Sequence, residues 1–224
     1  MSLCTRRRSR LSAISGSGEG IPLNGEVSPA GAVSFLEDWL KALVSTPGLT
    51  GISDLAEARR MLLEDSLRGV EVVSGFEGPI VDVGSGGGAP GIPLAISLPD
   101  REVTLLEAIG RKCDFLREWA LPNVRVMQGR AEEQETDGYG VAVAKALAKP
   151  PVAAEWCLPL VRPGGAVVLW AGPSVDTERV ARVAEQVGGE LAESRDGLLV
   201  LRKVQPTPQG FPRRTGVASK RPLD

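Results

Sequence analysis

A glycine-rich loop constrains the fold of this chain more than any other part of its sequence. Residues 80–83 form a short apolar run, and glycine then occupies five of the eight positions from 84 to 91. Residues 91–98 have the pattern of a helix, and a second apolar run ends in Glu107. A strand, a loop of nearly bare backbone, a helix and an acid at the tip of the next strand predict a pocket for a nucleoside-bearing cofactor. The acid would accept hydrogen bonds from ribose hydroxyls.

The glycines alone do not identify the cofactor, because residues 84–89 and 86–91 both fit the dinucleotide fingerprint. Two other features favour S-adenosylmethionine. Asp82 lies inside the first strand, where a carboxylate suits the ammonium of a methionine group and opposes a pyrophosphate. Residues 129–133 follow a third apolar run, where a doubly wound sheet would hold an adenine ring. The predicted cofactor-binding residues are Asp82, Gly84, Ser85, Gly86 and Ala89 on the methionine side, Glu107 on the ribose, Ala131 and Glu132 near the adenine, and Lys145.

Strand and helix patterns alternate through this part of the chain. Strands are predicted at 79–83, 102–107, 124–127, 139–144, 165–170, 190–194 and 198–204, and helices at 91–98, 110–119, 150–160 and 174–187. Asp196 and Gly197 join the last two strands and are a hairpin signal. Alternating βα units followed by a hairpin predict an α/β fold of the class I S-adenosylmethionine-dependent methyltransferase type. This is a Rossmann-like, doubly wound, mostly parallel seven-stranded sheet.

The predicted methyltransferase domain spans residues 76–204. A tail at 1–28 is rich in Ser, Gly and Arg and is expected to be disordered. Residues 29–75 predict a small helical extension that packs against the sheet; its first helix starts at a Ser28–Pro29 cap, and Asp54 with Glu57 resembles a capping box. Residues 205–224 form a basic C-terminal tail.

Composition excludes some kinds of chemistry. The chain has no histidine, so histidine general bases and histidine metal ligands are excluded, and no metal site is expected. The three cysteines lack metal-ligand spacing; Cys113 and Cys157 fit buried positions, as is usual in a reducing cytoplasm. No apolar run approaches the length of a membrane span, and the N-terminal arginines do not precede a secretory signal, so no membrane contact is expected.

Basic residues gather at the two ends of the chain. Residues 1–10 have four arginines and no acid, and residues 202–224 have six basic side chains against one acid, whereas the whole chain has a net charge of −2. Basic ends on an acidic body indicate a polyanionic partner near the termini. For the N-terminal run alone, a solvated tail without such a partner is the favoured interpretation.

Several motifs resemble one known family, the small-subunit ribosomal RNA guanine-N7 methyltransferases, long called glucose-inhibited division protein B. The motifs are Leu49–Thr50, Glu64–Leu67, the loop Asp82–Ile96 with its unusual Pro-Gly-X-Pro, Leu105–Glu107, Arg111–Lys112, Phe115–Leu116, Arg130–Glu133 and the tail Phe211–Leu223. The resemblance covers roughly residues 33–223. It implies methyl transfer from S-adenosylmethionine to N7 of a guanine in 16S ribosomal RNA, in the naked RNA or in the small ribosomal subunit, by a cytoplasmic protein expected to be a monomer.

Three positions depart from the family's pattern. Leu62 stands where the family usually has histidine, Ala144–Ala146 replaces Ser-Arg-Ala at the end of the fourth strand, and Ala171 replaces a lysine after the fifth. These departures leave open a cofactor-binding homologue with weakened catalysis. A class I methyltransferase acting on a small molecule is a second alternative, and a nicotinamide dehydrogenase is the least favoured.

The expected chemistry needs few side chains. N7 of guanine has an in-plane lone pair and no proton, so no catalytic acid or base is expected and the chemical step should show no enzyme ionisation between about pH 6 and 8. Lys145 is the candidate for positioning the reactants. Phosphate contacts are predicted for Arg213, Arg214, Lys220 and Arg221, in a segment expected to be extended.

Overall fold

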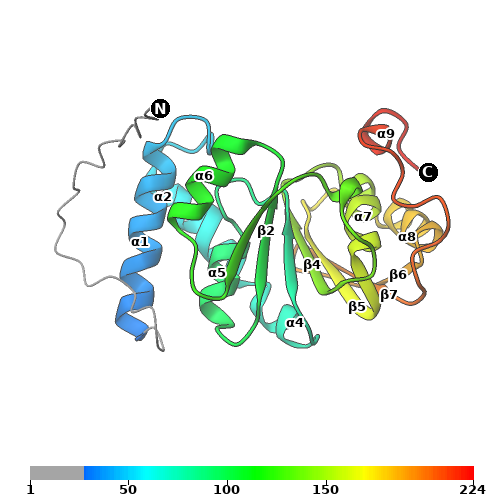
Figure 1. The fold of residues 1–224 in the computed structure, drawn as a ribbon, viewed down its shortest axis with the longest axis horizontal. Helices are drawn as coiled ribbons and strands as arrows, with labels where there is room; N and C mark the ends of the chain where they lie inside the picture. Colours follow the sequence, from blue (N-terminus) through cyan, green and yellow to red (C-terminus); the bar gives the residue numbers. More distant parts are fainter. Residues whose placement is uncertain (1–27) are drawn as a thin grey trace, which may run out of the picture.

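A computed structural model describes residues 28–224 of the chain as a seven-stranded sheet between two layers of helices (Figure 1). The strands lie in the order β3-β2-β1-β4-β5-β7-β6. β7 is antiparallel to both of its neighbours, and the remaining pairs are parallel. The predicted doubly wound sheet with a late antiparallel strand is therefore confirmed.

The elements have the following bounds. The strands are β1 (Ile80–Val83), β2 (Val103–Glu107), β3 (Val124–Gln128), β4 (Tyr139–Lys145), β5 (Val161–Trp170), β6 (Gly189–Arg195) and β7 (Leu198–Lys203). The helices of the N-terminal extension are α1 (Pro29–Ser45), α2 (Leu55–Ala58), the π-helix η1 (Arg59–Glu64), α3 (Asp65–Leu67) and α4 (Val70–Ser74). The others are α5 (Gly91–Ser97), α6 (Gly110–Glu118), the 3-10 turns η2 (Ala131–Glu133) and η3 (Leu158–Leu160), α7 (Pro150–Cys157), α8 (Thr177–Gln186) and α9 (Val217–Lys220).

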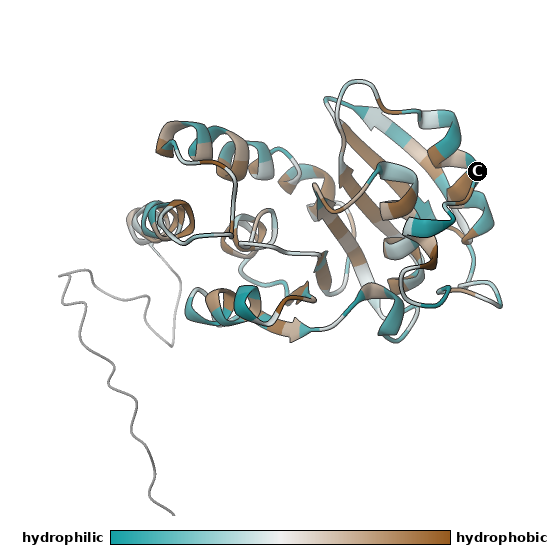
Figure 2. Cartoon of the chain, turned by 90° about the horizontal axis from the view of Figure 1, so that it is seen from above, coloured by the Kyte–Doolittle hydropathy of each residue, from teal (hydrophilic) through white to brown (hydrophobic). Residues whose placement is uncertain are grey.

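Side chains on successive strand positions point into two separate cores. Ile80 packs with α1, α5 and α6 on one face of the sheet, whereas Val81 packs with α7 and α8 on the other. Because side chains alternate along a strand, Asp82 lies on the same face as Ile80. Figure 2 shows the strands as a hydrophobic layer between helices that are polar on their outer sides.

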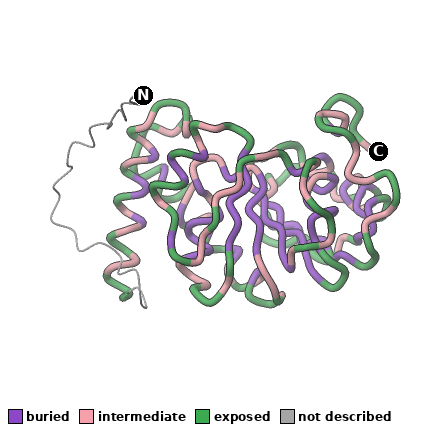
Figure 3. The backbone as a smooth tube through the Cα atoms, in the orientation of Figure 1, coloured by how far each residue is buried: buried purple, intermediate pink, exposed green. Residues whose placement is uncertain are grey.

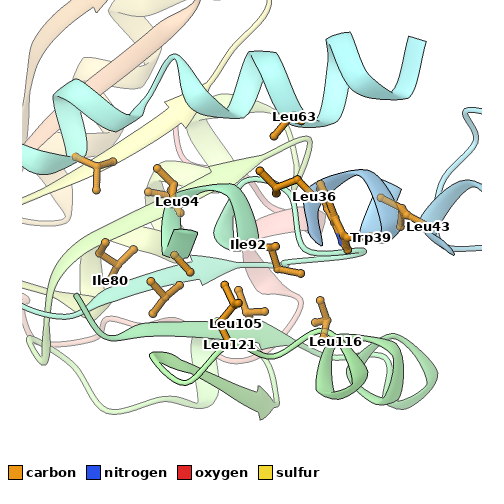
Figure 4. Packing of buried hydrophobic residues seen from close by; sticks show 14 of the residues in the cluster. Leu36, Trp39, Leu43, Leu63, Ile80, Ile92, Leu94, Leu105, Leu116 and Leu121 are labelled. Atoms are coloured by element: carbon orange, nitrogen blue, oxygen red, sulfur yellow. The ribbon is translucent and has the colours of Figure 1, made fainter. Parts of the chain in front are cut away.

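Hydrophobic residues join the N-terminal extension to the sheet. Trp39, Leu40 and Leu43 of α1 are almost completely buried in the same cluster as Ile92 and Leu105 (Figure 4). Figure 3 shows the buried strip along α1 facing the sheet domain. The extension is therefore part of the core that supports the glycine loop.

Local signals explain several element ends. The Ser28 Oγ accepts from the Gly31 N–H, and an Asp54 carboxylate oxygen accepts from the Glu57 N–H, as expected for N-caps. Asp196 and Gly197 both have positive φ in the β6–β7 turn, which confirms the hairpin prediction. The largest errors in the predicted bounds are three: β5 begins at Val161 and not at 165, α8 begins at Thr177, after its Asp176 cap, and α7 ends at Cys157 and continues as the 3-10 turn η3.

Some expectations concern residues for which the structure gives little or no description. The predicted disordered tail and the N-terminal arginine run lie outside the described residues, apart from Ser28.

Cys113 and Cys157 are buried free thiols, as predicted. Within residues 28–224, no helix has both the length and the apolar character needed to cross a membrane, and no cluster of acidic or cysteine side chains could hold a metal ion.

The C-terminal segment, residues 205–224, differs from the extended tail that was expected. It folds back over α7 and α8, and it ends in the short helix α9, whose Ala218 is buried (Figure 1). Arg179 of α8 donates to the Leu223 carbonyl and pairs with Asp224. The expectation failed because proline, glycine and charge predict solvent exposure, whereas the acidic partners of this segment lie far away in sequence.

Candidate cofactor-binding site

A pocket of about 220 Å³ opens at the carboxyl ends of the central strands. The chain adds β2 and β3 on one side of β1 and then crosses from β3 to place β4 on the other side, and doubly wound sheets bind ligands at this switch point. The lining residues come from β1, β2, α6, α7 and the segments after β3 and β4, and include Gly84, Glu107, Ala108, Lys112, Gly129, Arg130, Ala131, Glu132, Ala146, Leu147 and Trp156. Of the predicted cofactor residues, Gly84, Glu107, Ala131 and Glu132 line this pocket.

The glycine loop turns tightly at the tip of β1. The Gly84 and Ser85 N–H groups donate to the Leu106 carbonyl, and Gly84 has φ +71. The buried Ser85 hydroxyl donates to the Asp82 carbonyl, so this side chain holds the turn and does not line the pocket. Ala89 packs against the core that contains α1 and also does not line the pocket.

Asp82 lies beneath the loop and is almost completely buried. Its Oδ2 accepts from the Gly91 N–H at 3.0 Å, whereas no partner within the described residues reaches Oδ1. A Cβ at position 91 would lie 2.7 Å from Oδ2, so a glycine is required for this approach. The pKa of Asp82 is raised to about 7, chiefly by burial and also by nearby Glu107, while the hydrogen bonds and Lys145 oppose the shift.

Glu107 is fixed at the tip of β2 by two backbone groups. Its Oε2 accepts from the Gly86 N–H at 2.9 Å, and its Oε1 accepts from the Ile109 N–H at 2.8 Å. The residue is 6% exposed and lines the pocket. Each oxygen retains a lone pair, so the group can accept from a pair of ligand hydroxyls while the glycine loop holds its orientation.

The side of the pocket beyond Glu107 is formed by η2 and α7. Ala131 and Glu132 lie at the start of η2 and line the pocket, and their expected contact with the adenine remains a prediction. Trp156 of α7 also lines the pocket, and its buried Nε1 has no partner within the described residues. Sequence analysis missed Trp156, as well as Lys112 and Leu147. In a pattern, Trp156 is one more apolar residue of a helix, and only the packing of α7 on β4 and β5 brings it to the pocket.

Lys145 is held by the N-terminal extension. Its ammonium lies 2.8 Å from an oxygen of Asp65 and also donates to the Met61 carbonyl. The Trp170 indole donates to the Asp65 carbonyl at 2.7 Å, so the ends of β4 and β5 both contact the same turn of the extension. Lys145 therefore does not line the pocket, and its expected contact with the cofactor remains a prediction.

The four predicted phosphate-binding residues have different surroundings. Arg213 makes a bidentate ion pair with Glu155, a residue of α7 that is 3% exposed. The Arg213 charge is therefore paired inside the protein, and its expected phosphate contact remains a prediction. Arg214, Lys220 and Arg221 are exposed, and none of the three makes an ion pair within residues 28–224.

The hydrogen-bond acceptors of this site fit S-adenosylmethionine. The unpartnered Asp82 Oδ1 is an acceptor of the kind that a primary ammonium satisfies, and the Glu107 carboxylate suits the two ribose hydroxyls. Two buried carboxylates would oppose the pyrophosphate of a dinucleotide. The sheet order and this pocket define a class I S-adenosylmethionine-dependent methyltransferase.

The chain belongs to the rRNA small subunit methyltransferase G family, whose sequence profile matches residues 33–190. A relative named ribosomal RNA small subunit methyltransferase G in Synechococcus elongatus is 36% identical over 198 residues, covering 78% of this chain and 82% of the relative. The protein of the same name in Symbiobacterium thermophilum is 34% identical over 227 residues, covering 88% and 92% of the two chains.

A solved structure supports the fold assignment. A Pyrococcus horikoshii protein assigned as a transferase superposes with a TM-score of 0.51 at 15% identity, covering 62% of each chain. At this identity, the similarity concerns the fold alone.

Proposed function

We propose that this protein transfers the methyl group of S-adenosylmethionine to N7 of a guanine in 16S ribosomal RNA. The observation that carries the proposal is the Glu107 carboxylate, fixed by the Gly86 and Ile109 N–H groups at the rim of the pocket, in a chain that belongs to this family. S-adenosylmethionine supplies a methyl group on a sulfonium, which is an activated donor. We place its ribose at Glu107, its ammonium at Asp82 and its adenine between Glu132 and Trp156.

The protein's own contribution to the reaction is positioning. N7 presents a lone pair, so the acceptor needs no deprotonation and no side chain has to move a proton. Asp82 keeps one oxygen for an ammonium, and its hydrogen bond from Gly91 fixes the direction of that oxygen. Lys145 and Asp65 hold the extension against the ends of β4 and β5, which would set the distance between the acceptor base and the pocket.

RNA binding is proposed for three residues of the C-terminal segment. Arg214, Lys220 and Arg221 are exposed and lie on the segment that approaches the pocket through η2. Lys and Arg side chains of this kind bind phosphate and give RNA binding its dependence on salt. We further propose that the protein acts in the cytoplasm as a monomer, on the naked RNA or on the small subunit.

Incubation with a labelled methyl donor tests this function. Small-subunit RNA and intact small subunits, both lacking the modification, are each incubated with the protein, and the labelled base is mapped. Label at a guanine N7 is the expected result, and Glu107→Ala should abolish it by weakening donor binding. Donor binding without any transfer to either RNA substrate would instead favour a small-molecule methyltransferase or a homologue with weakened catalysis.

A further inference from the structure

The C-terminal segment makes polar contacts with two elements that line the pocket. Arg213 donates from Nε and Nη2 to the two carboxylate oxygens of Glu155, which is the residue before Trp156 on α7. Glu155 is buried, so Arg213 neutralises a charge that would otherwise be unpaired inside the protein. Arg213 therefore contacts α7 at the residue next to Trp156, which lines the pocket.

A second contact holds η2. The Gly216 N–H donates to Glu132 Oε1 at 3.0 Å, and the Thr215 hydroxyl donates to Glu133 Oε1 at 3.1 Å. Gly216 has φ +79, a conformation that lets its N–H face Glu132 and that a side chain would disfavour. Glu132 lines the pocket, so its carboxylate is directed by a backbone group 84 residues further along the chain.

The start of the segment is anchored independently of the pocket. The fully buried Lys203 ammonium donates to the Leu158 carbonyl at 2.8 Å and to Thr207 Oγ1 at 2.7 Å, and it lies 3.3 Å from Asp137. Thr207 also donates to Asp137 through its hydroxyl at 2.9 Å. This anchor fixes residues 203–207, so that the following residues reach α7 and η2 from a constant position.

We infer that Arg213, Thr215 and Gly216 are positioning residues of the cofactor pocket: they hold Glu132 and Trp156 in the geometry that binds the adenosine part of S-adenosylmethionine. The inference rests on the proposed function. It assigns to the inner side of the segment a role separate from the phosphate contacts of Arg214, Lys220 and Arg221 on its outer side. RNA that moves the segment would thereby change the affinity for the methyl donor, and the donor would change the affinity for RNA by the same factor.

Binding of two ligands to full-length Arg213→Met tests the inference. S-adenosylmethionine and 5′-methylthioadenosine are titrated by calorimetry, well below the melting temperature of the variant. Because both ligands contain the adenosine group, the dissociation constants of both should rise by the same factor, at least fivefold. Arg213→Lys, which keeps the charge and one hydrogen bond, should recover part of the loss. In methylation assays the KM for the donor should rise, and kcat at saturating donor should stay within twofold.

Arg179→Met is the matched control, since it removes an arginine that holds the same segment at its far end, on α8. Its dissociation constants should equal those of the parent. If folded Arg213→Met binds both ligands within twofold of the parent, the inference is wrong. If Arg213→Met does not fold, Thr215→Val decides in its place: a two- to fivefold loss for both ligands supports the inference, and an unchanged affinity overturns it. A parent protein that binds neither ligand would refute the proposed function, which is a separate outcome.

Discussion

The two sides of the pocket are supported in different ways. On the side proposed for the methionine group, α1 lies behind the glycine loop: the buried Trp39 indole donates to the Gly87 carbonyl at 2.9 Å, and the Leu43 side chain occupies the space where a Cβ of residue 87 would lie. On the side proposed for the adenine, η2 and α7 are held by the ion pair and hydrogen bonds of the C-terminal segment. One support is mainly apolar burial, and the other is polar.

This difference has consequences for stability and ligand binding. Loss of a large buried side chain removes transfer free energy and leaves a cavity, so the methionine side depends on the stability of the whole core. Polar contacts contribute less to net stability but impose direction on the groups they hold. Changes to α1 should therefore lower stability first, whereas changes on the inner side of the C-terminal segment should lower affinity first.

Trp39→Ala should have the largest effect on stability. Trp39 is completely buried between α1 and the glycine loop, and loss of such a side chain destabilises a domain by about 3–5 kcal/mol. Chemical denaturation measures the change in the free energy of unfolding. Lys41→Ala, at an exposed position of the same helix, is the control and should change stability by no more than about 0.5 kcal/mol. A loss below about 1 kcal/mol for Trp39→Ala would contradict the assignment of α1 as the apolar support.

Asp82→Asn should remove a pH dependence of stability that comes from the side of the pocket proposed for the methionine group. In the folded protein, burial raises the pKa of Asp82 to about 7 from its ordinary value of 3.8. Between these values the folded state binds more protons than the unfolded state, so this group lowers the free energy of unfolding as pH rises from about 4 to 7. The slope is up to about 1.4 kcal/mol per pH unit. Denaturation at several pH values should show that Asp82→Asn removes this slope.

Ligand binding gives the same test a second readout. The ionised Asp82 attracts the ammonium, so the parent should lose up to about tenfold in affinity for S-adenosylmethionine per unit as pH falls below 7. The charged groups that act on Asp82 are Glu107 and Lys145, and the Asp82→Asn variant retains both. 5′-Methylthioadenosine lacks the amino-acid group and should bind independently of pH over this range. An equal pH dependence for both ligands would place the titrating group on the adenine side. The absence of enzyme ionisation that is expected between about pH 6 and 8 then applies only to the chemical step at saturating donor.

Neutralising Arg214, Lys220 and Arg221 should have the smallest effect on stability and donor binding. The three side chains are exposed, so their removal should leave donor affinity unchanged. The slope of log affinity for ribosomal RNA against log salt should flatten by about 0.7–0.9 for each phosphate that the variant no longer binds. Neutralisation of the exposed Arg125, Arg195 and Arg202 is a control of equal charge and should leave the slope as in the parent. A weaker donor affinity in the first variant would show that the outer side of the segment also supports the pocket.

Truncation of the C-terminal segment is a less informative experiment than the sequence suggests. If this segment were a free tail, its removal after Lys203 would abolish RNA methylation and spare donor binding. In the folded protein, such a truncation also removes Thr207 from Asp137 and Arg213 from Glu155. We therefore expect truncation to weaken both activities, and point substitutions on the inner and outer sides are needed to distinguish them.

The sequence by itself determined the order of the elements and the cofactor of the class. Strand periodicity, the glycine loop and Glu107 follow one another within about thirty residues, so local pattern was sufficient to place them. The class of fold and the family could be inferred from the same segment and the motifs around it.

Only the tertiary structure decided which polar groups pair across the chain. Arg213 was predicted to bind phosphate because its neighbours are basic, but its partner Glu155 lies 58 residues earlier. The salt bridge between Lys145 and Asp65 of the extension likewise joins residues that are far apart in the sequence. Trp156 reaches the pocket only because α7 packs on the sheet. Hydrophobic period and backbone turns are local properties that a sequence displays directly. An ion pair instead depends on which two distant surfaces the completed core brings together, and no local pattern contains that information.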